Sequence, residues 1–379
     1  MKVTVAIDSM KGSLSTFEAG EAIAEGIRKV YADAEVKICP LADGGEGTVE
    51  AIVAATGGEM VTVTAHNPLG ELIKSSYGII SKTQTAIIEM AAASGITLID
   101  ETERNPLCTT TFGVGEMILD AIERGCRNFV IGIGGSATND GGIGMLQALG
   151  FAFLDDNGKP VPFGAKGLKE LAKINIDNAR KELKDCNFCI ACDVTNPLCG
   201  ENGCSAIYGP QKGATPDMIA DMDGWLENYA ALTKEQLPMA DENYPGAGAA
   251  GGLGFAFLAY LGGTLKPGVD LVIQETHLEE YMKDADIVIT GEGRLDGQSY
   301  MGKAPIGVAK LGKKYKKPVI AFSGCVTKDA ALCNEHGIDA FFPIVRTPCT
   351  LQEAMKKENA YQNLKDTVEQ VFRFYKAVE

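Results

Sequence analysis

The feature that most constrains the fold of this chain is a repeated unit in which an apolar strand leads into a glycine-containing loop and then a helix. The first unit has a strand over residues 2–8 and a loop over residues 9–15. Ser15 and Glu18 have the spacing of a capping box, so a helix should begin there. Further units of this kind begin near residues 35, 285 and 317. Strands that alternate with helices predict a doubly wound, mostly parallel α/β sheet.

The predicted secondary-structure pattern changes in the middle of the chain, which indicates a second domain. Two alternating runs joined at residues 67–70 predict a β-hairpin, and Pro216 suits the first position of a helix. At 379 residues the chain exceeds the size at which single cores usually stop growing. We expect a Rossmann- or flavodoxin-like domain built from residues 1–60 and 270–379. In this interpretation residues 61–269 form an inserted α/β domain.

The net charge of −15 excludes several classes of partner. An acidic chain is unsuited to nonspecific binding of nucleic acid or of an anionic membrane, and only local Lys or Arg side chains could hold an anionic substrate. Residues 246–265 carry no charge, but their seven glycines favour a glycine loop that enters a buried helix over a membrane span. The start of the chain, MKVTVAIDS, lacks a signal-peptide pattern, so we expect a cytoplasmic protein. No pattern predicts the oligomeric state.

The spacing of Cys186, Cys189 and Cys192 matches the pattern of some zinc and iron–sulfur sites. The segment CNFCIACDV also has the composition of a buried strand, in which Cys189 would face away from the other two. We therefore interpret these thiols as small buried hydrophobic groups that bind no metal. Many cysteines without an evident pairing also suit a reducing compartment.

The glycine-rich segment GIGGSATNDGG, residues 132–142, follows an apolar strand and precedes a helix. This arrangement can present backbone N–H groups to an anion, so we favour a phosphate-binding loop over a purely structural turn. The segment is not a Walker A loop, because no G-x-x-x-x-G-K-[ST] occurs in the chain. A G-x-G-x-x-G at residues 246–251 lacks a preceding strand, which argues against a dinucleotide-binding motif there.

Carboxylates follow several predicted strands, at the edge where ligands bind in open parallel sheets. Asp8, Asp43 and Glu292 occupy such positions, and Lys11 and Arg294 are close by in the sequence. A single aspartate after a strand can simply cap a turn. Three carboxylates with nearby cations favour a functional site.

The remaining candidates are consistent with phosphoryl transfer. The segments CDVTNPLCG and YGPQKGATP contain Asp193, Asn196 and Lys212, although a lysine in such a turn is more often on the surface. The three histidines are scattered and form no triad or metal-binding pattern. Phosphoryl transfer requires positioning, a metal, cationic contacts and an aspartate that accepts a hydroxyl proton. Glycine loops, carboxylates and a few cations meet that requirement.

The chain also resembles the bacterial type-1 glycerate kinase family over essentially its whole length. The resemblance rests on the segments DSMKGSLS, PLADGGEGT, RNPLCTTTFGVGE, GIGGSATNDGG, CDVTNPLCG, YGPQKGA, PGAGAAGGLG and TGEGRLDGQS. It implies a kinase that phosphorylates glycerate with ATP and Mg²⁺, built from two α/β domains with the active site in the cleft between them. It leaves open which hydroxyl is phosphorylated, which stereoisomer is preferred, and which glycine-rich segment holds ATP.

The residues expected at the site fall into three groups. The catalytic group comprises Lys11, Asp193, Arg294 and Asp296, with Asp193 favoured over Asp296 as the general base. The expected Mg²⁺ ligands are Asp43 and Glu292. The groups expected to bind substrate or phosphate are Asp8, Ser13, Asp43, Gly44, Gly45, Gly134, Gly135, Ser136, Thr138, Asn139, Asp140, Asn196, Lys212, Gly291, Glu292 and Gly293. A kinase of a related small hydroxy acid or sugar acid and a noncatalytic ligand-binding protein remain alternatives.

Overall fold

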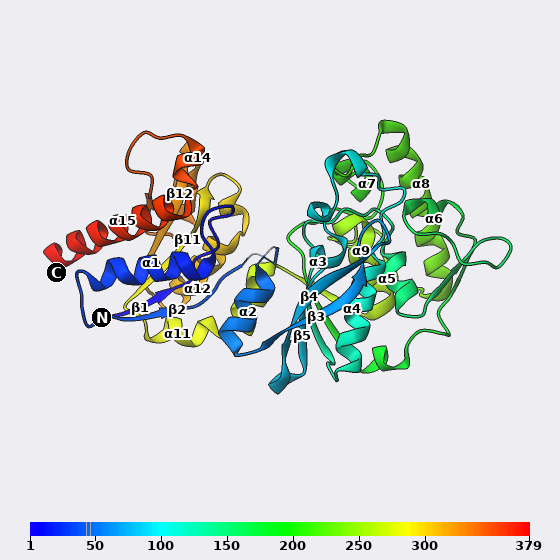
Figure 1. Ribbon diagram of the computed structural model, residues 1–379, viewed down its shortest axis with the longest axis horizontal. Coiled ribbons are helices and arrows are strands. Elements are labelled where there is room, and N and C mark those ends of the chain that lie inside the picture. The colour runs from blue at the N-terminus through cyan, green and yellow to red at the C-terminus, as the bar shows by residue number, and fades with distance from the viewer. Residues whose placement is uncertain (43, 46) are drawn as a thin grey trace. The chain divides into compact units, whose positions relative to one another are not determined.

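The computed structural model describes residues 1–379 except residues 43 and 46 and the side chain of Met301. The chain divides into two compact units (Figure 1). The first, here called the terminal unit, comprises residues 1–43, 50–56 and 269–379. The second, the inserted unit, comprises residues 44–49 and 57–268. Each unit packs helices against a mostly parallel sheet, so the predicted α/β class is confirmed.

The terminal unit contains a five-stranded sheet in which every pairing is parallel. Its order is β13-β12-β11-β1-β2, formed by Ala340–Pro343, Val319–Val326, Ile287–Leu295, Lys2–Val5 and Glu35–Ile38. Numbered along this unit alone, the order is 2-1-3-4-5, that of the flavodoxin-like doubly wound sheet. In such a sheet the order reverses between the first and third strands, here β1 and β11, and ligands bind at the carboxyl ends of the strands there.

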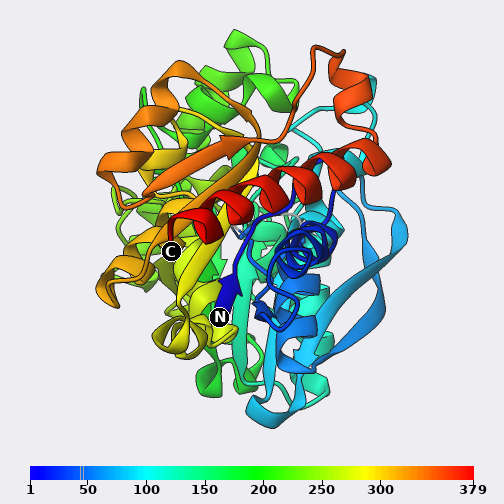
Figure 2. The same cartoon turned by 90° about the vertical axis from the view of Figure 1, so that its left-hand side faces the viewer.

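Helices cover both faces of this sheet. They are α1 (Thr16–Arg28), α10 (Gly268–Glu275), α11 (Leu278–Asp284), α12 (Ala304–Lys314), α13 (Leu332–Glu335), α14 (Leu351–Ala354) and α15 (Lys357–Val378), with α2 (Thr48–Thr56) divided between the units. Helices α1 and α15 lie side by side (Figure 2) and share an apolar cluster with Ile287 and Ile289. Val288, between those two residues, points to the other face, toward Gly312 of α12. This alternation is the two-residue period of a strand covered on both faces.

The capping box predicted for the first helix is confirmed. The Oγ of Ser15 accepts a hydrogen bond from the N–H of Glu18 at 3.3 Å, and Oε2 of Glu18 accepts the N–H of Ser15 at 2.9 Å. Two backbone N–H groups at the start of α1 are thereby satisfied. This cap fixes where the loop after β1 ends.

The structure differs from the sequence-based expectation at Glu292, which was expected to follow a strand. Strand β11 instead continues to Leu295, and Gly291 and Glu292 pair with Phe322 and Ser323 of β12. A Cβ on Gly291 would lie 1.9 Å from the carbonyl oxygen of Phe322, and the φ of Gly291 is +155°. The glycine therefore permits close approach within the sheet, and Glu292 lies inside a strand, not after it.

The inserted unit contains a six-stranded mixed sheet. Its order is β10-β9-β6-β5-β4-β3, formed by Thr264–Lys266, Asn187–Ala191, Asn128–Gly132, Thr85–Glu89, Leu72–Ile80 and Glu59–His66. Strands β3 and β4 are antiparallel, which confirms the predicted hairpin. The Oδ1 of Asn67 accepts the N–H groups of Leu69 and Glu71 at 2.9 Å and closes its turn. A separate pair, β7 (Ala152–Leu154) and β8 (Lys173–Asn175), is antiparallel.

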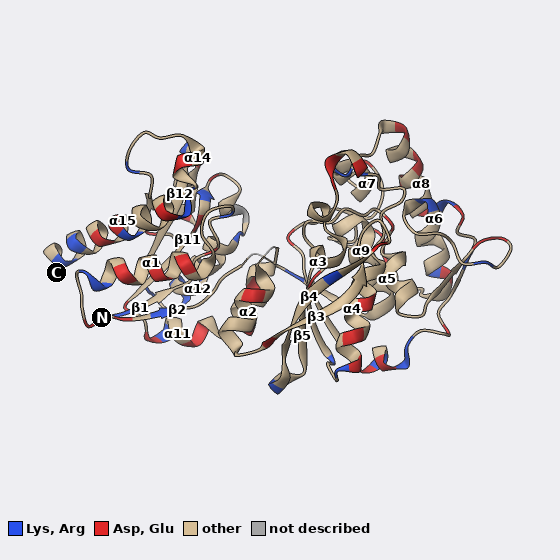
Figure 3. Cartoon of the chain, viewed as in Figure 1, with Lys and Arg blue, Asp and Glu red and all other residues tan. Residues whose placement is uncertain are grey.

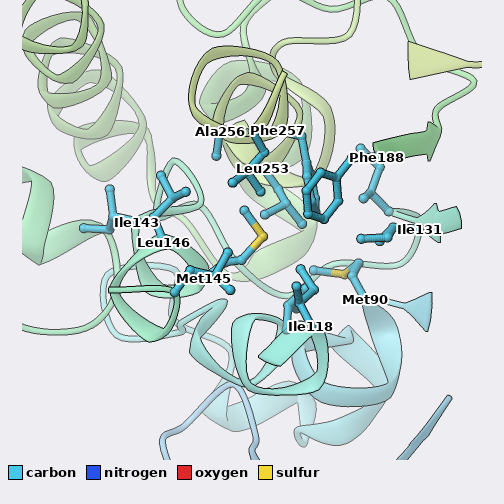
Figure 4. Close-up of a cluster of buried hydrophobic side chains, with 14 of the residues drawn as sticks. Met90, Ile118, Ile131, Ile143, Met145, Leu146, Phe188, Leu253, Ala256 and Phe257 are labelled. Carbon is cyan, nitrogen blue, oxygen red and sulfur yellow. The ribbon is translucent and has the colours of Figure 1, made fainter. Parts of the chain in front are cut away.

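The inserted unit has a large apolar core, part of which is shown in Figure 4. Its helices are α3 (Ala91–Ser94), α4 (Phe112–Glu123), α5 (Ile143–Ala148), α6 (Ala165–Lys169), α7 (Cys204–Tyr208), α8 (Pro216–Gln236) and α9 (Ala249–Leu261). As predicted, α8 begins at a proline, and Thr215 caps it by accepting the N–H of Met218. The uncharged segment that contains α9 is buried in this core, with Leu253 and Phe257 fully enclosed.

Lys and Arg residues and Asp and Glu residues are interspersed along the chain in both units (Figure 3). Within the described part of the chain, no helix has both the length and the apolar character that crossing a bilayer requires.

Candidate functional site

The terminal unit contains a pocket of about 530 Å³ at the carboxyl ends of β1 and β11. One part of its wall is polar and comes from the segment after β1 and from the end of β11. The polar side chains predicted from the sequence that lie here are Asp8, Lys11, Ser13, Glu292, Arg294 and Asp296. The other part is apolar and comes from the segment around α14. Of the sequence-predicted residues of this unit, all line this one cavity except Gly291, which lies within the sheet, and Asp43, which is outside the described residues.

The segment after β1 is held against β11. The N–H of Asp8 donates to the carbonyl of Gly291 at 3.0 Å, and its Oδ1 accepts the N–H of Ser9 at 2.7 Å. The Asp8 side chain is only 4% exposed, in contrast to the exposed Lys11. The Oγ of Ser13 is buried without a hydrogen-bond partner among the described residues. A buried hydroxyl of this kind, in a pocket wall, suits a ligand that would satisfy it.

The end of β11 carries a network of hydrogen bonds around Glu292. The Oγ of Ser299, in a 3₁₀ turn formed by Ser299–Met301, donates to Oε1 of Glu292 at 2.6 Å. The same hydroxyl accepts the N–H of Asp296 at 3.1 Å. The Nε of Arg294 lies 3.3 Å from Oδ2 of Asp296. Ser299 thus links the carboxylate of Glu292 to the backbone of Asp296.

Ser299 and Lys303 are residues that the sequence analysis missed. Lys303 lines the pocket and is the N-cap residue of α12. Ser299 does not line the pocket, but its hydroxyl fixes the carboxylate of Glu292, which does line it. The spacing of Asp296 and Ser299 within the segment LDGQS could have identified Ser299, because a serine side chain often accepts a hydrogen bond from the backbone N–H three residues before it.

In the inserted unit, the glycine-rich segment exposes little besides Gly134 and Gly135. Thr138, Asn139 and Asp140 are fully buried, and Ser136 is 7% exposed. The predicted strand before this segment and the predicted helix after it are β6 and α5. The segment therefore offers a ligand mainly its two exposed glycines.

The carboxylate of Asp140 binds the protein's own backbone. It accepts the N–H and the Oγ–H of Thr111 at 2.8 and 2.9 Å, and the N–H groups of Gly142 and Gly144 at 3.1 and 3.3 Å. Burial raises the pKa of Asp140, and these hydrogen bonds oppose the shift. The start of α5 was expected to bind an external anion. The N–H groups of Gly142 and Gly144 do not serve this purpose, because they already donate to Asp140.

Lys212 is buried, although a lysine in a glycine turn is usually solvated. It is 2% exposed, and its Nζ donates to the carbonyl of Thr138 at 2.6 Å. Burial lowers the pKa of Lys212 from 10.5 to about 8. The Oγ of Thr138 and the Oδ1 of Asn139 are buried without a partner among the described residues. Lys212 thus supports the glycine-rich segment from inside the unit.

Asp193 and Asn196 lie in the segment that follows β9 (Asn187–Ala191). Asp193 is exposed, and its Oδ1 accepts the N–H of Gly268 at 2.9 Å. Asn196 accepts the hydroxyl of Tyr208 at 2.7 Å and donates its amide to the carbonyl of Asn202 at 2.9 Å. Asn196 therefore ties its own loop together, whereas Asp193 presents a carboxylate of fixed orientation at the surface.

Asp43, predicted as a ligand of Mg²⁺ and of substrate, lies outside the described residues. Gly44 follows it with a φ of +86°, and a Cβ there would lie 2.7 Å from the Cβ of Ala191. The carbonyl of Gly45 accepts the hydroxyl of Thr48 at 2.7 Å at the start of α2. Only a glycine suits position 44, because both the backbone conformation and the surroundings there exclude a side chain.

The described residues contain no group of three or more His, Cys, Asp or Glu side chains with the geometry of a metal site. Mg²⁺ does not require such a group, since proteins often bind it through one or two carboxylates together with substrate phosphates. The carboxylates of Asp8 and Glu292, both largely buried and both in the pocket wall, have the oxygen chemistry that Mg²⁺ prefers. All eleven cysteines are free thiols.

Comparisons with known proteins agree over nearly the whole chain. Residues 3–376 match the model of the glycerate kinase family. The glycerate 2-kinase of Escherichia coli (strain K12) is 50% identical over 364 residues, which cover 96% of this chain and 95% of that protein. The glycerate kinase of Haemophilus influenzae (strain ATCC 51907 / DSM 11121 / KW20 / Rd) is 47% identical over 373 residues, 98% of each chain.

A solved structure gives the same result at the level of the fold. The crystal structure of the "putative glycerate kinase 2" from Salmonella typhimurium LT2 has a TM-score of 0.91 to this protein at 47% sequence identity, and the match covers 100% of this chain and 98% of that one. Sequence, family model and fold therefore lead to one conclusion: the chain belongs to the glycerate kinase family.

Proposed function

We propose that this protein is a glycerate kinase that transfers the γ-phosphoryl group of ATP to a hydroxyl of glycerate, with Mg²⁺, and releases phosphoglycerate and ADP. The observation that carries the proposal is the family match over residues 3–376. The E. coli relative is named glycerate 2-kinase, and this favours the 2-hydroxyl as the acceptor. The cations and carboxylates of the terminal-unit pocket supply the chemistry that phosphoryl transfer requires.

The polar wall of the pocket suits the charge of a phosphoryl group in transfer. Lys11 and Arg294 would stabilise the negative charge that spreads over the phosphoryl oxygens. Asp8 and Glu292 would hold Mg²⁺, and Asp43 remains a further proposed ligand. When bound, the metal neutralises phosphate charge. Ser299 would keep the Glu292 carboxylate in one orientation.

Asp193 is the proposed general base, and Asp296 is its alternative. In the transfer, the acceptor oxygen forms a bond to the γ-phosphorus while the bond from that phosphorus to the bridging oxygen of ADP breaks. The hydroxyl proton passes to the aspartate carboxylate. The hydrogen bond from Gly268 N–H leaves Asp193 exposed and oriented, as a base requires.

The proposal is tested by incubating the purified protein with ATP, Mg²⁺ and glycerate and identifying the product by ³¹P NMR. The chemical shift and coupling of the product distinguish 2-phosphoglycerate from 3-phosphoglycerate. We expect 2-phosphoglycerate and no turnover in excess EDTA. The identity of the acceptor is tested with a panel of small hydroxy acids and sugar acids. Faster turnover of another acid than of glycerate would mean that this other acid is the substrate. Absence of ADP release with every acid would favour a noncatalytic ligand-binding protein.

A further inference from the structure

The pocket of the terminal unit lies at the point where the strand order reverses. Asp8 and Lys11 follow β1, and Glu292 and Arg294 belong to the end of β11, the neighbouring strand on the other side of the reversal. In open α/β sheets of this order, nucleotide cofactors bind in the crevice outside these strand ends. The topology thus makes this a place suited to a nucleotide.

The volume of the pocket favours a nucleotide over glycerate as its ligand. Its volume of about 530 Å³ is within the range of roughly 300–1,000 Å³ that encloses ligands the size of a drug or a nucleotide. Glycerate, with a three-carbon skeleton, would leave most of this space empty.

The apolar part of the wall is the second argument. Val345, Leu351 and Met355 line the pocket, and their side chains are 38%, 74% and 36% exposed. Large apolar side chains gathered at a cavity and left in contact with water favour an apolar, flat ligand group. Glycerate has no such group, whereas a purine base has two apolar faces.

The apolar and polar parts of the wall adjoin each other. A Cβ on Gly12 would lie 2.8 Å from Cε of Met355, so the side chain of Met355 touches the loop that carries Lys11. Helix α14, which starts at Leu351, is fixed by a capping box between Thr350 and Glu353. A ligand that is apolar at one end and strongly anionic at the other could therefore contact both parts at once.

We propose that this pocket binds the nucleotide substrate, with its adenine base against Val345, Leu351 and Met355 and its phosphates toward Lys11, Arg294 and Lys303. Three cations in one pocket of a chain with a net charge of −15 suit a polyphosphate. The inference rests on the proposed function, because it takes the nucleotide to be ATP or ADP. Glycerate then binds elsewhere in the protein.

The experiment separates the two substrates. Leu351→Ser and Val345→Ser each remove apolar contact from the wall at a position where the side chain is largely or partly in water, so the fold should survive. We measure the KM of ATP, the KM of glycerate, and the Kd of MgADP by calorimetry without acceptor. Leu351→Ser should raise the KM of ATP and the Kd of MgADP about tenfold, as expected when a leucine contact is lost. The KM of glycerate should stay unchanged.

Leu72→Ser is the matched control, because Leu72 is 66% exposed and belongs to the inserted unit, outside the pocket. It should leave all three constants at the wild-type values. A raised KM of glycerate with unchanged MgADP binding would assign the pocket to the acceptor and overturn the inference. Unchanged constants in both wall variants, or a wild-type protein that binds no MgADP, would also overturn it.

Failure of the proposed function gives a different result. If the wild-type protein produced no phosphoglycerate but bound MgADP, and Leu351→Ser weakened that binding, the nucleotide site would stand and only the acceptor would be wrong. The calorimetric measurement therefore tests the pocket independently of turnover.

Discussion

The hydroxyl of Ser299 donates a hydrogen bond of 2.6 Å to Oε1 of Glu292, and both side chains are buried. The hydroxyl also accepts the N–H of Asp296. A single serine therefore orients one pocket carboxylate and fixes the backbone that carries another. Hydrogen bonds to a charged group are worth more than those between neutral groups, about 1.5–3 kcal/mol.

From this relationship we predict that Ser299→Ala lowers kcat/KM about tenfold or more, in line with the loss of one charge-assisted hydrogen bond. The Mg²⁺ concentration needed for half-maximal rate should rise, because Glu292 loses its fixed orientation. Steady-state kinetics over a Mg²⁺ titration, with a thermal melt to verify folding, measure both effects. Wild-type activity and wild-type Mg²⁺ dependence in a folded variant would contradict the role of Ser299.

Asp193→Asn should lower kcat and leave the affinity for glycerate nearly intact. The asparagine Oδ1 can still accept the N–H of Gly268, so the loop should keep its shape while the base is lost. General-base catalysis contributes about 10²- to 10⁴-fold, and kcat should fall within that range. Measurements of kcat and of glycerate Kd for Asp193→Asn and Asp296→Asn decide the role. If Asp193→Asn keeps near wild-type kcat and Asp296→Asn loses it, Asp296 is the base.

Local signals made much of the fold predictable. The capping box at Ser15, the hairpin turn at Asn67 and the helix start at Pro216 each depend on residues a few positions apart, and each is confirmed. The strand–loop–helix order likewise follows from short apolar patterns. These features need no knowledge of the rest of the chain.

Contacts between distant segments account for what the sequence did not predict. Strand β11 extends past Gly291 because β12 continues beside it, and no local pattern records that pairing. Asp140 was expected to face a ligand, but Thr111, 29 residues earlier, supplies two of its donors. Lys212 is buried because its ammonium reaches the carbonyl of Thr138, 74 residues away. Residue type and spacing give no information about such partners.

Lys11→Ala and Arg294→Ala should each lower kcat/KM by a large factor, and cations that stabilise a transferring phosphoryl group reach roughly 10³-fold or more in extreme cases. Both side chains line the pocket, and the side chain of Arg294 is 65% exposed, so its removal should leave the fold intact. Lys82→Ala, at an exposed position in the inserted unit, is the control for loss of a positive charge. Changes of less than about threefold for both pocket variants, well below that range, would remove them from the catalytic group.

The buried ammonium of Lys212 predicts a pH dependence of stability. Its pKa is about 8 in the folded protein, against 10.5 for an ordinary lysine. Between these values the unfolded chain holds a proton that the folded chain has released, so raising the pH through this window favours the folded state. The buried thiol of Cys204 and the hydroxyl of Tyr229 have raised pKa values and act in the opposite direction. The contribution of Lys212 must therefore be isolated by comparison with a variant.

Lys212→Met keeps a long apolar side chain and removes the charge and the hydrogen bond to Thr138. The lost hydrogen bond shifts the free energy of unfolding by an amount that does not vary with pH, whereas the lost titration changes the slope. We predict that the wild-type protein gains stability relative to Lys212→Met by about 1.4 kcal/mol per pH unit above pH 8. Urea denaturation at pH 7.5, 8.5 and 9.5 with a thiol reductant measures this difference, and the exposed Lys82→Met should show no such slope. A difference that stays constant across this range would mean that Lys212 remains charged in the folded protein.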